Sequence, residues 1–217
     1  MLTDQKPDSF FSSSELELLR TKSSLRGVLM VAHCWGVIFC TWLIVANWTN
    51  LLTVLVGIMI IGTRQLGLFV LAHEAAHFNL STSRKLNDWL MQWPLNRVLL
   101  GGTGEGYRKY HIQHHAFTQQ ENDPDLVLSK PFPISVKSLR RKILRDLTGQ
   151  TGVKLYGATI REAFSGANFS ECFKTGLRRL GPNLIINLGL FVGFAFFEVW
   201  YLYFLLWWVP ALTWKHF

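Results

Sequence analysis

Five of the seven histidines of this chain gather in two short clusters whose spacing suits metal binding. The first cluster reads HEAAH at residues 73–77, and the second reads HIQHH at residues 111–115. On a helix, side chains three or four positions apart lie on one face, so the imidazoles of each cluster can reach a common metal ion. Five imidazoles are too many for one catalytic zinc ion and suit two metal ions, iron among the candidates. The predicted ligands are His73, His77, His111, His114 and His115.

The first cluster also matches the His-Glu-x-x-His motif of zinc proteases, in which two histidines bind zinc and the glutamate is the general base. In that alternative His73 and His77 bind one zinc ion, Glu74 activates water, and Asp123 or Asp125 supplies a third ligand. The second cluster then has no function, which favours the centre with two metal ions. A third alternative is a membrane protein that binds no metal and whose histidines form a polar patch at the interface.

Long apolar segments flank the two clusters and predict where they are positioned. Hydrophobic residues make up 49% of the 217 residues, and charged residues make up 17%, against about a quarter in soluble domains. Residues 27–46 carry no charge and would cover about 30 Å as a helix, the thickness of a hydrocarbon core. Residues 51–72 form a second span that contains Arg64, and residues 183–214 are long enough for a helical hairpin. The sequence predicts an all-α membrane protein with four transmembrane helices in two hairpins, 27–72 and 183–214.

The remaining segments are polar and complete a single domain over residues 1–217. Residues 1–25 are predicted to be a cytoplasmic N-terminal segment, and residues 73–182 a cytoplasmic metal-binding region with interfacial and cytoplasmic helices. Within it, residues 86–100 are apolar but too short and too interrupted to span, which indicates an interfacial or re-entrant helix.

The net charge of +8 comes with basic residues that lie between the apolar spans, which marks the cytoplasmic side of a membrane protein rather than a nucleic-acid-binding protein. The N-terminus is polar and lacks the apolar core of a signal peptide. Three widely spaced cysteines predict neither a disulfide framework nor a thiolate metal site. We therefore expect a multi-pass integral membrane protein with its N-terminus and histidine clusters in the cytoplasm.

The spacing of the clusters and their neighbouring residues resemble the first two histidine boxes of membrane fatty acid desaturases. His-x-x-x-His stands at the end of a span, His-x-x-His-His follows some thirty residues later, and the segment GYRKYHIQHHAFTQQENDPDL is similar to the family's second box. The resemblance covers roughly residues 25–214 and extends to the layout of two spans, a long loop and two more spans. The motifs are shared with hydroxylases and carotenoid ketolases, so they do not specify the substrate.

The resemblance implies that the five cluster histidines bind two iron ions in a non-haem di-iron centre. Dioxygen would be the co-substrate, a fatty acyl lipid in the membrane would be desaturated, and a ferredoxin or a b-type cytochrome would donate electrons. Asp123 and Asp125 would support the ligating histidines by hydrogen bonds, or alternatively serve as turn residues around Pro124.

The chain departs from the family pattern near its C-terminus. Family members carry a third box of the His-x-x-His-His type after the fourth span, where this sequence has only His216. We therefore expect a C-terminally truncated or frameshifted member, or a fragment, and an inactive truncated form is one expected outcome.

Overall fold

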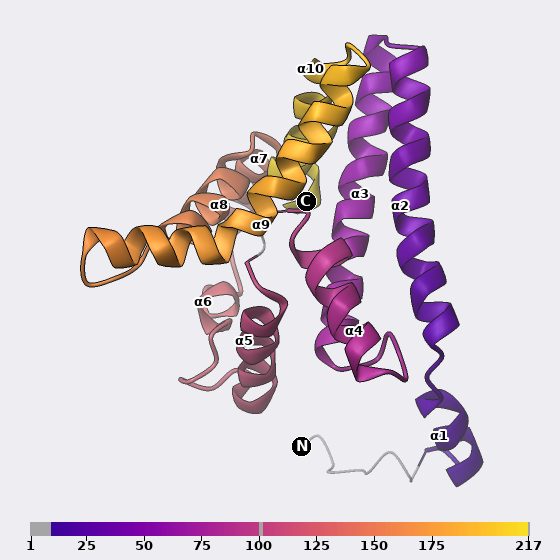
Figure 1. Ribbon diagram of the computed structural model, residues 1–217. Coiled ribbons are helices and arrows are strands. Elements are labelled where there is room, and N and C mark those ends of the chain that lie inside the picture. Colours follow the sequence, from indigo (N-terminus) through magenta and orange to yellow (C-terminus); the bar gives the residue numbers. More distant parts are fainter. Residues whose placement is uncertain (1–9, 100–101, 217) are drawn as a thin grey trace.

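The computed structural model describes residues 10–99 and 102–216, and every regular element within these ranges is a helix. The beginning of the predicted cytoplasmic segment, residues 1–9, lies outside the described residues. The all-α prediction is confirmed for the part of the chain that the structure describes. Figure 1 shows two tall groups of helices side by side, with shorter helices gathered at one end and along one flank.

Helices α2 (Ser24–Asn47) and α3 (Leu51–Ala76) run antiparallel beside each other (Figure 1). A tight polar turn joins them, where the Asn50 side chain accepts from the Thr53 backbone N–H and caps α3. Both helices are long and apolar enough to cross a membrane. Helix α3 runs beyond the predicted span and carries His73 in its last turn.

The third helix with the length and composition of a span is α9 (Phe169–Phe196). Pro182 lies inside it, and Figure 1 shows the first half of α9 running across the molecule before the second half rises towards α10. A proline removes one helical hydrogen bond and favours such a bend. The returning chain consists of short pieces, which are α10 (Trp200–Tyr203), η3 (Phe204–Trp208), α11 (Val209–Leu212) and η4 (Trp214–His216). Three candidate spans are therefore present in the described residues, and a fourth within residues 183–214 remains a prediction.

The polar middle of the chain forms shorter helices that connect α3 to α9. The segment predicted as an interfacial or re-entrant helix, 86–100, contains α4 (Arg84–Leu90), which continues into the π-helix η2 (Met91–Asn96) with Pro94 inside it, and residue 100 lies outside the described residues. The other helices of this region are α5 (Gly104–Phe117), α6 (Leu126–Ser129), α7 (Val136–Leu147) and α8 (Gln150–Ala163), whereas the short helix α1 (Ser13–Arg20) precedes α2.

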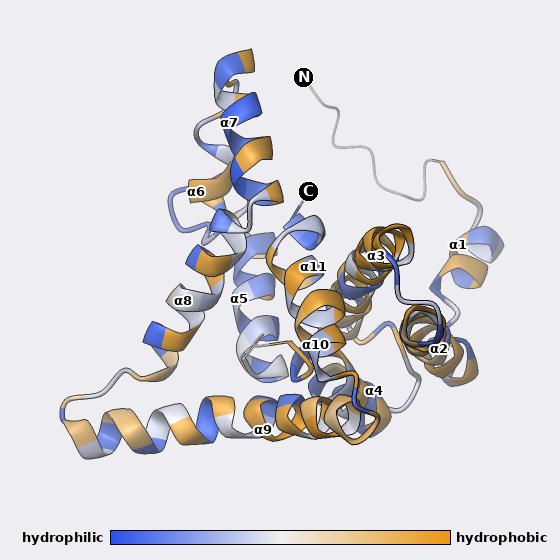
Figure 2. Ribbon diagram, turned by 90° about the horizontal axis from the view of Figure 1, so that it is seen from above, coloured by the Kyte–Doolittle hydropathy of each residue, from blue (hydrophilic) through white to orange (hydrophobic). Residues whose placement is uncertain are grey.

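The core lies where α2, α3 and η3 meet, around the fully buried side chains of Ile38, Ile61 and Trp207. The outward surfaces of α2 and α3 are also apolar, as the orange ribbons of Figure 2 show, and Leu43 and Leu52 are well exposed there. A helix that is hydrophobic on every side matches a lipid environment rather than water.

Buried amide side chains join the helices across this apolar interior. Gln65 Nε2 donates to the carbonyl of Trp207 at 2.8 Å. Asn183 and Asn187 donate to the carbonyls of Leu99 and Val98, which follow the π-helix and have left the regular helical pattern. A buried carbonyl without a partner is costly, so these amides fix how α9 lies against the segment after η2.

Candidate metal centre

The end of α3 positions the first pair of histidines. His73 lies in its last turn and His77 is its C-cap residue. The chain reverses immediately afterwards at Phe78, whose φ of 58° is a left-handed conformation that glycine usually adopts at this position. A bulky residue is strained there, and such strain persists where surrounding contacts hold the chain in place. The reversal leaves His77 at the tip of the helix, facing α5.

Helix α5 supplies the second group of histidines from the opposite side. Thr103 caps its start by accepting from the backbone N–H of Gly106. His111 and His115 lie one turn apart on the face that meets α3, and His111 is buried. The ring of Tyr107, one turn earlier, stacks on His111 with an interplanar angle of 9° and a centroid distance of 5.5 Å.

Four imidazoles from the two helices converge on one point. His77 Nε2 lies 2.8 Å from His111 Nε2, which in turn lies 3.0 Å from His115 Nε2. One ring nitrogen from each of His73, His77, His111 and His115 falls within 4.8 Å of the others. With metal–nitrogen bonds of about 2.1 Å, ligands at right angles are separated by about 3 Å. The spacing of these nitrogens therefore fits a set of metal ligands.

The protonation of the cluster also suits metal binding. Burial and the neighbouring histidines His73, His115 and His77 lower the pKa of His111 to about 4. Burial and the neighbouring histidines His115 and His73 lower the pKa of His77. Both rings are therefore neutral at physiological pH, which is the form that donates a lone pair to a metal ion.

His114, the fifth predicted ligand, lies outside the group of four. Its Nδ1 is 2.7 Å from Asp123 Oδ1 and 3.5 Å from Asp125 Oδ2. The hydrogen bond to Asp123 raises the pKa of His114. Asp123 is itself buried, and although burial opposes its ionisation, hydrogen bonds from His114 and from the backbone N–H groups of Gln119 and Asp125 lower its pKa. The loop after α5 thus surrounds an ionised carboxylate that accepts a hydrogen bond from Nδ1 of the His114 ring.

Arg108, which the sequence reasoning passed over, connects the two histidine-bearing helices. It lies three residues before His111, and its guanidinium donates to the carbonyls of Ala75 and Ala76 at the end of α3, each at 3.1 Å. The same group donates to Asp88 Oδ1 on α4 at 2.6 Å. Its Cζ lies 4.0 Å from the centroid of the Phe78 ring, a cation–π distance. The arginine therefore fixes both the end of α3 and the reversal that follows it.

Glu74, the general base of the zinc protease alternative, is hydrogen-bonded on both oxygens. Its Oε1 lies 3.0 Å from His73 Nδ1, and its Oε2 accepts from Asn79 Nδ2 at 3.1 Å. These contacts fix the orientation of the His73 ring and leave its Nε2 as the nitrogen that can bind a metal ion.

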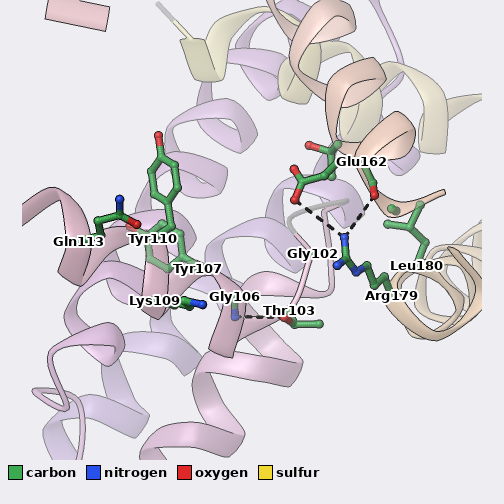
Figure 3. A pocket seen from close by; sticks show the side chains of 12 residues that line it. Gly102, Thr103, Gly106, Tyr107, Lys109, Tyr110, Gln113, Glu162, Arg179 and Leu180 are labelled. Carbon is green, nitrogen blue, oxygen red and sulfur yellow. Dashed lines mark hydrogen bonds and ion pairs between the residues drawn. The ribbon is translucent and has the colours of Figure 1, made fainter. Parts of the chain in front are cut away.

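A cavity of about 440 Å³ lies on the other side of Tyr107, between α5, α8 and α9 (Figure 3). Figure 3 shows Tyr107 and Tyr110 on one wall and Arg179 with its partner Glu162 on the other. Tyr110 donates to Asp125 Oδ1 at 2.6 Å, so this wall is linked to the loop that holds His114.

His216 does not join the four-histidine group. It lies in η4, and burial together with the neighbouring Lys215 lowers its pKa.

The fold and the site together define a membrane protein whose apolar helices carry, at one end, a cluster of four histidines with the spacing of metal ligands. The sequence matches the family model described as fatty acid desaturase over residues 46–217, so the chain belongs to the fatty acid desaturase family. It is accordingly an integral membrane protein of the desaturase and hydroxylase superfamily of oxidoreductases. No solved structure matches the chain.

Proposed function

We propose that this protein is a membrane-bound, oxygen-dependent fatty acyl or lipid desaturase with a non-haem di-iron centre. The observation that carries the proposal is the convergence of four ring nitrogens from the two histidine boxes within 4.8 Å. The family match supports the same class of chemistry, and the three apolar helices support a centre that lies beside a lipid phase.

The residues that would hold iron are His73, His77, His111 and His115, with His114 as a further ligand through its Nε2. When bound, the iron pair supplies the activation of dioxygen that removal of hydrogen from an unactivated methylene pair requires. The chain itself supplies neutral imidazoles and holds them in position. Asp123 accepts a hydrogen bond from Nδ1 of His114 and thereby leaves Nε2 of His114 to bind the metal. This is a common arrangement around metal ligands.

The electron donor in this proposal is an acidic ferredoxin or a b-type cytochrome. Helix α7 offers five exposed basic side chains, Lys137, Arg140, Arg141, Lys142 and Arg145, of which Lys142 pairs with Asp146. Such a surface attracts a partner of opposite charge and speeds its encounter. The substrate is a fatty acyl lipid drawn from the membrane.

The proposed topology has four spans, with the N-terminus and the histidine boxes in the cytoplasm. Lys22 and Arg26 flank the start of α2, at the same end of the hairpin as the histidines of α3 (Figure 1). Basic residues beside membrane spans are enriched on the cytoplasmic side.

Metal content tests the centre directly. We would purify the full chain in detergent and count iron and zinc per polypeptide. The proposal predicts close to two iron ions, and the H77A/H111A double variant should lose them. About one zinc ion, with dependence on Glu74 and none on His114, would instead support a metalloprotease. A chain that binds no metal would contradict the proposal.

Product analysis tests the reaction. Membranes containing the protein, an electron donor and labelled acyl lipid should yield an unsaturated acyl chain and consume dioxygen. Hydroxylated acyl chains or an oxidised carotenoid would place the protein with the other members of the superfamily.

A further inference from the structure

A groove of about 790 Å³ lies between α2 and α3, away from the metal centre. Its walls are mainly apolar, and its ionisable nitrogen groups, which belong to two arginines and a histidine, are basic. The residues that matter here are Arg26, Met30, His33, Arg64, Leu66 and Val70.

Arg64 is an unusual residue to find in this groove. It lies near the middle of α3, which is a candidate membrane span, and no described carboxylate lies within ion-pair distance of it. The Sγ of Cys34 donates to the Arg64 carbonyl at 3.2 Å, so Arg64 lies level with His33 on the antiparallel helix. An arginine in a membrane span is costly unless it meets water, a partner charge or a headgroup.

The depth of the three basic groups matches one edge of the bilayer. About 30 Å of helix measured from Leu51 ends near Val70, which places Arg64 about 9 Å inside that boundary, within reach of a snorkelling side chain. Arg26, seven residues before His33, lies about 10 Å nearer the histidine boxes and outside the boundary. The three basic side chains therefore form a column that leads from the interface into the groove.

We propose that this groove binds one anionic phospholipid from the leaflet on the histidine-box side. The phosphate diester is held by Arg64 and Arg26, with a hydrogen bond from His33, because guanidinium groups pair well with phosphate oxygens. One acyl chain lies along Met30, Leu66 and Val70. The site carries three basic residues and no acidic residue, so it selects an anionic headgroup over a zwitterionic one.

The proposal does not depend on the metal centre, because its residues lie apart from the histidine boxes and its readout is lipid binding. Full-length protein in detergent is titrated with phosphatidylglycerol or with phosphatidylcholine of the same acyl chains, and bound lipid is counted by native mass spectrometry. We expect one phosphatidylglycerol to bind in preference to phosphatidylcholine. The R26Q/R64Q double variant should bind phosphatidylglycerol at least tenfold more weakly than the parent.

Two further variants separate the groove from general charge and from folding. R178Q removes a positive charge from the exposed surface of α9, outside the groove, and should bind like the parent. R64K keeps the charge but loses the forked guanidinium, so it should bind more weakly than the parent and more strongly than R26Q/R64Q, provided that it elutes as a monodisperse species of unchanged helicity.

Three results would overturn the proposal. They are equal binding of the two lipids, equal losses in R178Q and in R26Q/R64Q, and displacement of phosphatidylglycerol by an equal concentration of oleate. The last would identify the occupant as a free fatty acid. A dimer in place of the lipid adduct would assign the groove to a second copy of the chain.

Discussion

Replacing Arg108 by methionine removes the contacts that join α5 to the end of α3 while keeping an unbranched, apolar side chain. The guanidinium is about one-fifth exposed and donates to the carbonyls of Ala75 and Ala76. Two such bonds contribute about 2 to 3 kcal/mol together. The partner Asp88 is half exposed, so that ion pair adds less than about 1 kcal/mol. Stacking on Phe78 adds about 0.5 to 1 kcal/mol.

We therefore expect R108M to lower the free energy of unfolding by about 3 kcal/mol, a factor of about 150 in the equilibrium constant. Because the arginine fixes the end of α3 beside His77, the metal centre should loosen as well. Iron affinity should fall about 10- to 100-fold, as is typical when a group that orients metal ligands is removed.

The assay measures the free energy of unfolding and the iron affinity on the same preparations. The first comes from unfolding in detergent, and the second from the iron bound per chain at a series of free iron concentrations. K109M is the matched control, since it removes a neighbouring charge whose side chain is exposed and makes none of these contacts. R108K keeps the charge but cannot reach three acceptors at once, so it should lie between the parent and R108M. Unchanged stability and iron affinity in R108M would refute the assignment of Arg108 as a positioning residue.

Three further predictions follow from other contacts of the chain. D123N should weaken iron binding about 10-fold, because it replaces the ionised acceptor that orients His114 with a neutral amide, and a chain that binds iron normally with this substitution would contradict that function. N187L removes buried hydrogen bonds and should lower the free energy of unfolding by about 1 to 2 kcal/mol, measured in detergent against the parent. Burial opposes ionisation of Asp146, but the hydrogen bond from Lys142 outweighs it and lowers the Asp146 pKa, so this carboxylate stabilises the fold at neutral pH. That stability should be lost as the pH falls through the depressed pKa, and D146N should lack this part of the acid dependence.

The sequence alone determined the features that depend on local pattern. Residues 27–46 and 51–72 are strongly apolar apart from a few residues such as Arg64 and Gln65, so their helical spans follow from hydropathy without knowledge of the partners. The two histidine boxes were also visible, because metal ligands at helical spacing need only their own helix to share a face. The family resemblance rested on the same residues and is confirmed.

Only the tertiary structure decided which side chains meet between helices far apart in the sequence. His77 and His111 are 34 positions apart, and their 2.8 Å separation depends on the reversal at Phe78 and on Arg108. Phe78 could not be predicted as a left-handed residue, since that conformation is maintained by contacts rather than by its own preference. The two halves of the segment 183–214 also depend on tertiary contacts, because Asn187 and its partners set where α9 and the returning chain lie. Hydropathy is a sum over neighbouring residues, whereas these contacts join distant ones, and only the folded chain brings them together.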